Sequence, residues 1–157
     1  MPKSKHKNWP AVLEYAESIR DGKKIACVEL KQAVDRFFRD LENPDYWMDH
    51  KDPEFCIQII EKTLCHQQGE SLDGTPMRGK PFTLQPFHKF CIYNLVGFKL
   101  KDTQIVKYHE ALIYIPRKNS KSTFAAALAW ALSILRRKSG AKCYVASAAH
   151  MLSLESI

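Results

Sequence analysis

The residue types between Pro116 and Thr123 are suited to binding the phosphate groups of a nucleotide. Lys121 would reach the β- and γ-phosphates as a mobile ammonium, and Ser122 would offer its hydroxyl to Mg²⁺. Arg117 adds a planar cation suited to a γ-phosphate. We therefore take Arg117 and Lys121 as candidate catalytic residues. The candidate nucleotide-binding residues of this segment are Pro116, Arg117, Lys118, Asn119, Ser120, Lys121, Ser122 and Thr123.

A phosphate-binding loop has to lie between a strand and a helix, because backbone amides and the positive helix N-terminus must face the anion. The apolar run from His109 to Ile115 predicts a buried strand, which Pro116 would end. Residues 122–136 are mostly small and apolar, which predicts a helix covered by neighbours. Residues 141–146 indicate a second strand. This order predicts a βαβ crossover, a parallel sheet and the α/β fold class.

The loop departs from the pattern G-x-x-x-x-G-K-[ST] at both glycine positions, which are Ile115 and Ser120 here. Glycine at the second position would permit a positive φ and a close backbone approach to the phosphate. Spacing alone therefore leaves an alternative open. In that alternative the segment is a basic turn, and Ser122 caps the helix that follows.

The first 65 residues or so are predicted to be entirely helical. Apolar residues recur there at helical spacing in three segments. The predicted helices run from Trp9 to about Asp21, from Cys27 to Leu41, and from an N-cap at Asp52 to about Leu64. The polar segment Gln67 to Lys80 contains three glycines, which predicts a linker or surface loop with a subdomain boundary. A further helix is predicted from Phe87 to Val96, closed by Gly97.

Composition narrows the function classes without selecting one. The 157 residues are 45% hydrophobic and 26% charged, and no apolar run approaches the ~20 residues of a membrane span, so we expect a cytoplasmic protein and no membrane partner. Five widely spread cysteines without a C-x-x-C pair favour free thiols over a metal cluster. The net charge of +7 fits a polyanionic partner such as nucleic acid. A non-catalytic basic nucleic-acid-binding or interaction module is therefore a second hypothesis.

The segment Ile115 to Thr123 resembles the variant Walker A loop of the large terminase subunits of tailed bacteriophages, where an arginine follows proline or alanine. The resemblance extends over nearly the whole chain. Glu14 to Glu17, followed by Gly22 to Cys27, is similar to the start of that family's helical N-terminal part. Gly79 to His88 resembles its adenine-side element, which usually ends in tryptophan and glutamine. Phe87 and His88 stand at those positions here.

Two other interpretations of this element remain open. Phe87 is also a candidate core aromatic residue, and His88 a candidate surface residue of a helix. Neutral histidine offers one donor and one acceptor on separate nitrogens, whereas glutamine carries both on one amide. His88 and Gln85 are both candidate adenine contacts, and Gln85 is the fallback.

The resemblance implies an ATPase that binds ATP and Mg²⁺ and drives double-stranded DNA into a procapsid. It also implies two partners, the small terminase subunit and the portal. The implied domains are a helical N-terminal subdomain with its linker, residues 1–78, and the beginning of a P-loop ATPase domain, residues 79–157. An unpaired sheet edge would also favour association of copies into a homo-oligomer.

No apolar strand ending in Asp-Glu follows Ser122, so the sequence offers no Walker B element. It offers no acidic cluster for the nuclease half of such a motor either. We therefore expect a truncated product or fragment that hydrolyses ATP poorly, or not at all, by itself.

Overall fold

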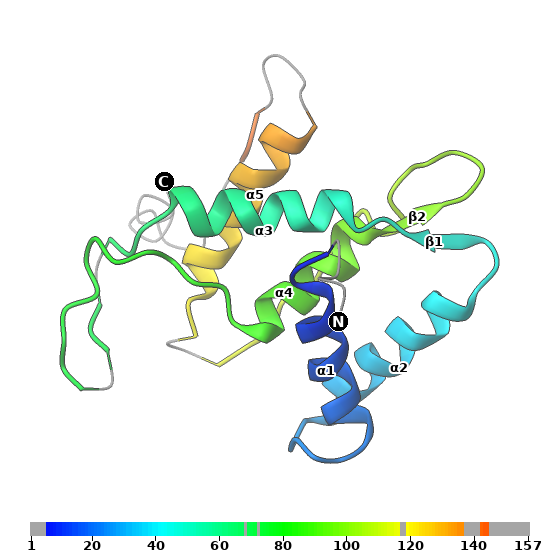
Figure 1. Ribbon diagram of the computed structural model, residues 1–157, viewed down its shortest axis with the longest axis horizontal. Helices are drawn as coiled ribbons and strands as arrows, with labels where there is room; N and C mark the ends of the chain where they lie inside the picture. Colours follow the sequence, from blue (N-terminus) through cyan, green and yellow to red (C-terminus); the bar gives the residue numbers. More distant parts are fainter. Residues whose placement is uncertain (1–5, 68, 72, 117–118, 137–141, 145–157) are drawn as a thin grey trace. The chain divides into compact units, whose positions relative to one another are not determined.

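The computed structural model describes residues 6–67, 69–71, 73–116, 119–136 and 142–144. These residues form helices and one small two-stranded sheet, so the structure is α/β in the coarse sense of mixing both elements. The elements are α1 (Trp9–Arg20), α2 (Val28–Glu42), β1 (Tyr46–Met48), α3 (Lys51–Thr63), α4 (Pro86–Ile92), the π-helix η1 (Tyr93–Gly97), β2 (Phe98–Leu100) and α5 (Lys121–Leu135) (Figure 1).

Two compact units interleave along the chain. The first contains Met1–Ile57 and Leu84–Ala111, and the second contains Gln58–Thr83 and Leu112–Ile157. The sequence predicted one boundary, after residue 78, between a helical subdomain with its linker and the beginning of an ATPase domain, and that division stays a prediction. The order of the units along the chain depends on contacts between distant segments, which local sequence patterns do not report.

Aromatic side chains form the core of the first unit, in which α1 packs against α2 and α4 (Figure 1). Phe37 on α2 is fully buried at their centre. Its ring centroid lies 5.2 Å from that of Phe90, 5.7 Å from that of Phe98 and 6.0 Å from that of Trp9. The helical periodicity predicted α1, α2 and α3 correctly. Their apolar stripes are what this core buries.

The sheet joins segments on either side of α3 and α4. β1 pairs with β2 in antiparallel register, with Tyr46 opposite Leu100 and Met48 opposite Phe98. The prediction that the first 65 residues are entirely helical was therefore wrong at β1. The predicted helix Phe87–Val96 is present, but η1 forms its last turn. Gly97 ends this turn, where an added Cβ would lie 2.5 Å from Met48 Sδ.

Buried carboxylates in the first unit are held by hydrogen bonds. Glu54 accepts bonds from the backbone N–H and the side-chain amide of Asn8, both 2.7 Å long, and from the Tyr93 hydroxyl at 2.8 Å. Burial and the bond to Glu54 raise the pKa of Tyr93. Buried Asp40 accepts bonds from the Lys107 ammonium and the Tyr108 hydroxyl. These partners offset the cost of removing charge from water.

The start of α3 is set by Asp49 rather than by the predicted N-cap Asp52. The Asp49 carboxylate accepts a hydrogen bond from the Lys51 N–H at 2.8 Å, where the helix begins. Lys99 forms ion pairs with both aspartates. Burial alone would raise the pKa of Asp49, but the bonds from Lys99 and the Lys51 N–H lower it overall. The cap therefore lies three residues earlier than the sequence suggested.

In the second unit, the segment predicted as a linker or surface loop forms an antiparallel arm at the surface, so the surface-loop alternative is confirmed. The His66 N–H donates to the Lys80 carbonyl at 2.9 Å, and the Gly79 N–H donates to the His66 carbonyl at 2.8 Å. The Phe82 N–H donates to the Leu64 carbonyl at 2.9 Å, which closes the base of the arm. The Asp73 carboxylate supports the turn at its tip by accepting the Thr75 N–H. These bonds satisfy backbone groups that a free linker would leave to water.

The prediction of a buried strand from His109 to Ile115 was wrong, and these residues are in no strand. Leu112 and Tyr114 are 92% and 94% exposed. A strand needs a hydrogen-bonded neighbour, and none of the segments that the structure describes pairs with this one. Lys142–Tyr144, inside the second predicted strand, are likewise exposed and not in a strand. The rest of that predicted strand lies outside the described residues.

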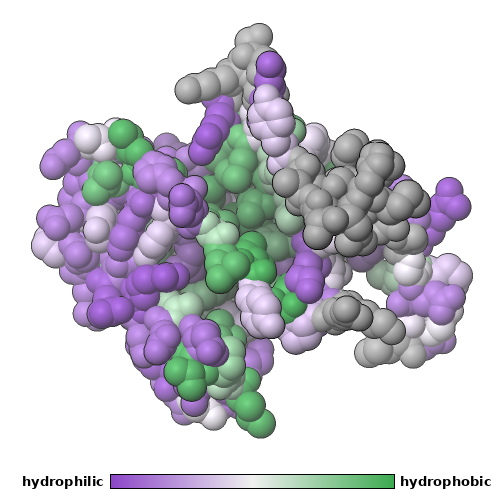
Figure 2. Space-filling model, turned by 180° about the vertical axis from the view of Figure 1, so that it is seen from behind, coloured by the Kyte–Doolittle hydropathy of each residue, from purple (hydrophilic) through white to green (hydrophobic). Residues whose placement is uncertain are grey.

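Several large apolar side chains are exposed. Figure 2 shows green, hydrophobic areas among mainly purple, hydrophilic side chains on the face it presents. The most exposed large apolar residues are Ile25, Val28, Leu112, Tyr114 and Tyr144. In the described part of the chain, no helix combines the length and the apolar character needed to cross a membrane.

Candidate phosphate-binding loop

The loop before α5 turns through a left-handed residue. Ser120 is the N-cap of α5, and its φ of 54° and ψ of 29° lie in the αL region. Left-handed backbone costs a residue with a Cβ about 1–2 kcal/mol, which is why glycine is common at such positions. The sequence suggested that Ser120 stands where a phosphate-binding loop has its second glycine. The backbone there adopts the conformation that a glycine would permit.

Lys121 is the first residue of α5, one position before the predicted start at Ser122. Its ammonium donates a hydrogen bond to the Ile115 carbonyl at 3.0 Å and so spans the turn. The Asn119 amide donates to the Pro116 carbonyl at 3.3 Å. These two contacts hold both sides of the loop together. Sequence reasoning missed the role of Ile115, because a backbone carbonyl leaves no residue-type signal.

The N-terminus of α5 presents donors and positive potential. The first N–H groups of a helix have no intrahelical partner, and the helix dipole adds partial positive charge there. The Ser120 side chain does not cap these groups, although its carbonyl accepts the Phe124 N–H at 2.8 Å. The alternative in which Ser122 caps the helix does not hold, because Ser122 lies inside α5. The described polar side chains here are all exposed: Asn119, Ser120, Lys121, Ser122 and Thr123.

Three other candidate residues belong to this segment, and the structure describes one of them. Pro116 is exposed and contributes its carbonyl to the loop. Arg117 and Lys118 lie outside the described residues, so their contribution stays a prediction. The second unit as a whole has ten Lys and Arg residues against four Asp and Glu, whereas the first has fourteen against thirteen. The excess positive charge of the chain therefore belongs mainly to the unit that contains this loop.

Gln85 and His88 belong to the first unit, where they cap α4. The Gln85 side chain accepts the His88 backbone N–H, and the Gln85 backbone N–H donates to His88 Nδ1 at 3.1 Å. The His88 side chain is buried, and burial lowers its pKa to about 4. The interpretation of His88 as a surface helix residue was wrong. Phe87 is half-buried and its ring lies against that of His88, with centroids 3.9 Å apart.

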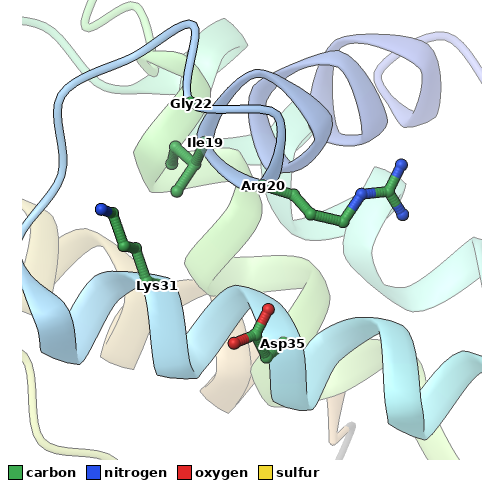
Figure 3. A pocket seen from close by; sticks show the side chains of 5 residues that line it. All are labelled: Ile19, Arg20, Gly22, Lys31 and Asp35. Atoms are coloured by element: carbon green, nitrogen blue, oxygen red, sulfur yellow. The ribbon is translucent and has the colours of Figure 1, made fainter.

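A small pocket also lies between α1 and α2, lined by Ile19, Arg20, Gly22, Lys31 and Asp35 (Figure 3). Figure 3 shows the Arg20 side chain pointing away from Lys31. The Arg20 guanidinium lies 4.2 Å from the centre of the Phe38 ring and 3.6 Å from the Asp21 carboxylate. Because Arg20 is engaged and Asp35 adds negative charge, this pocket is a poorer anion site than the loop before α5.

Across the described residues, no group of three or more His, Cys, Asp or Glu side chains is placed to hold a metal ion. No protein-family model, curated protein or solved structure matches this chain.

Proposed function

We propose that the loop before α5 binds the phosphates of ATP with Mg²⁺, and that the chain is the ATP-binding portion of a terminase large subunit. The observation that carries this proposal is the left-handed Ser120 next to Lys121 at the start of a fifteen-residue helix. Ser120 is held there in a left-handed conformation that favours glycine. A helix that only needed a cap would be satisfied by Ser120 in ordinary extended backbone.

Each described loop residue has a chemical role in this proposal. The Lys121 ammonium exchanges the Ile115 carbonyl for phosphate oxygens, which are stronger, charged acceptors. Ser122 offers its exposed hydroxyl to Mg²⁺. Magnesium keeps most of its ligands as water and phosphate oxygen, so one protein hydroxyl suffices at this stage. Bound ATP would supply the free energy that a packaging motor converts into movement of double-stranded DNA.

The proposed family membership requires structural features beyond the loop. The parallel sheet of a P-loop ATPase would need residues 111–115 to become a strand, and their apolar side chains suit burial. The small terminase subunit, the portal and a homo-oligomer of this chain are the proposed partners. Arg117 is proposed to act on the γ-phosphate, in its own site or in that of a neighbouring copy.

Isothermal titration calorimetry with ATP and Mg²⁺ tests the proposal directly. We expect binding by the wild-type chain and at least about a tenfold loss of affinity in Lys121→Ala, because the variant removes a charge-assisted hydrogen bond. Lys62→Ala is the matched control, since Lys62 is an exposed lysine of the same unit on α3. Equal affinities in all three folded proteins would refute the proposal.

The charge of the second unit favours one other candidate function, a non-catalytic basic module that binds nucleic acid. Ten basic residues against four acidic ones would attract a phosphate backbone whatever its sequence. This candidate predicts duplex DNA binding that weakens steeply with salt and is unchanged by ATP or by Lys121→Ala. Filter binding at several salt concentrations, with and without ATP, separates the two.

A further inference from the structure

The residues that lead into α1 meet the rest of the first unit through two stacked imidazole rings. The ring centroids of His6 and His50 lie 4.3 Å apart, and the ring planes are inclined by 21°. The His50 ring also lies in a T-shaped arrangement with that of Trp9 on α1, with centroids 4.7 Å apart. We propose that the stack is a proton-sensitive latch, which holds His6 and Lys7 on the first unit at neutral pH and releases them in mild acid.

A proton on His50 is disfavoured while the stack is closed. His50 Nδ1 is buried and has no hydrogen-bond partner in the part of the chain that the structure describes. A protonated imidazole carries N–H groups on both nitrogens, so Nδ1 would become a buried donor of a charged ring without an acceptor. A charge on His6 would also repel a charged His50 across the stack. Burial and His6 accordingly lower the pKa of His50.

The carboxylate of Asp49 favours the charged form of His50, but it already has other partners. It forms an ion pair with Lys99, in which the ammonium and carboxylate lie 2.5 Å apart. It also accepts the Lys51 N–H at 2.8 Å. These bonds compensate the charge of Asp49, so it offsets only part of the cost of charging His50.

Glu54 is the second carboxylate that favours a charged His50, and it is likewise engaged. It accepts two bonds from Asn8 and one from the Tyr93 hydroxyl. Lys89 on α4 donates to the side-chain oxygen of Asn8 at 2.8 Å, which ties this cation to the same network. The Tyr93 ring on η1 lies 6.0 Å from that of His50, and its raised pKa keeps the hydroxyl neutral.

Release in acid follows from proton linkage. A released His50 would be solvated and would have the ordinary pKa of about 6.5, whereas its pKa in the closed stack is lower. Below pH 6.5 the released form therefore binds more protons than the closed form, so a falling pH favours release. Above that pH, His50 is neutral in both forms and the stack stays closed.

Backbone order tests the latch, measured by NMR on the isotope-labelled full chain between about pH 7.5 and about pH 5. Order parameters of His6 and Lys7 should fall from about 0.85 at the higher pH to below about 0.6 at the lower. The amides of α1 from Val12 to Ile19 should stay rigid, because their side chains belong to the buried core. Constant order at His6 and Lys7, or loss of order together with α1, overturns the proposal.

Two variants test whether the imidazole pair is responsible. His50→Phe keeps an aromatic ring that cannot take up a proton, so His6 and Lys7 should stay ordered at both ends of the pH range. His6→Phe removes the repulsion from the other ring and should lower the pH at which order is lost. His109→Asn, at an exposed residue of the same unit, is the control and should leave the pH response unchanged. A response that neither Phe variant shifts overturns the proposal.

Discussion

The two compact units use their charged side chains differently. In the first unit the buried carboxylates of Asp40, Asp49 and Glu54 accept hydrogen bonds from neighbouring side chains or backbone. In the second unit the described Lys and Arg side chains, among them Lys121 and Arg136, are exposed. A charge that stabilises the fold cannot be given to a ligand without loss of stability. The first unit also exposes cations such as Lys24 and Lys101, but its fourteen Lys and Arg residues are nearly balanced by thirteen Asp and Glu, so the excess positive charge belongs to the second unit.

Apolar side chains also differ between the units, although the first unit exposes Ile25 and Val28. Phe37 and its aromatic neighbours are enclosed in the first unit, whereas the second unit exposes Leu112 and Tyr114 almost completely. Burial of apolar area is the main stabilising contribution to folding, so the first unit has more of what an independent fold needs. Exposed apolar residues of the second unit are expected to be covered when a partner or further strand is present.

The largest expected effect is on the aromatic core. Phe37→Ala should lower the free energy of unfolding of the first unit by about 3–5 kcal/mol, because it removes a fully buried ring. Urea unfolding followed by tryptophan fluorescence in a Trp130→Phe background reports on this unit, since Trp9 and Trp47 belong to it. Phe55→Ala, at a 37% exposed residue of α3, is the control and should cost far less. A loss for Phe37→Ala no larger than the control would break the comparison.

Lowering the pH should reduce the free energy of unfolding by a somewhat smaller amount. His88 has a pKa of about 4 when folded against 6.5 when unfolded, because burial disfavours its charged form. Between these values the unfolded chain binds more protons, so stability falls as the pH falls from 6.5 to 4, by up to about 3 kcal/mol. Urea unfolding across this range measures the slope. His88→Asn should reduce the slope of stability against pH, whereas His109→Asn, at an exposed residue, should not. An unchanged slope in His88→Asn would contradict the lowered pKa of His88.

A change of about 1 kcal/mol in stability is expected at the loop before α5. Ser120→Gly should relieve left-handed strain, raising stability by about 1 kcal/mol without weakening ATP binding. Ser133→Gly, in the interior of the same helix, should have the opposite sign, because glycine there costs about 1 kcal/mol. Thermal unfolding followed by circular dichroism, with ATP titrations of each variant, measures both effects. Destabilisation by Ser120→Gly would mean that the positive φ is not the conformation in solution.

Helix periodicity was the most informative local signal. It predicted α1, α2, α3 and α5 to within one or two residues, because each helix carries its own hydrogen bonds and its own apolar stripe. The polar run before Pro81 was predicted as a linker or surface loop, and hydrogen bonds between its two sides make it a surface arm. Whether the loop binds ATP stays a prediction. The positive φ of Ser120 was expected only because the motif has a glycine at that position.

The helices, the charge excess and the residue types of the candidate loop follow from local sequence. The strands and the hydrogen-bond partners of individual polar residues depend on contacts between distant parts of the chain. β1 is three residues long and exists because Phe98–Leu100 pairs with it from a distant part of the chain. The apolar segment 111–115 matched a buried strand in composition, yet it forms none where no described segment pairs with it. Strand pairing and burial depend on contacts between distant residues, whereas a helix satisfies its backbone locally.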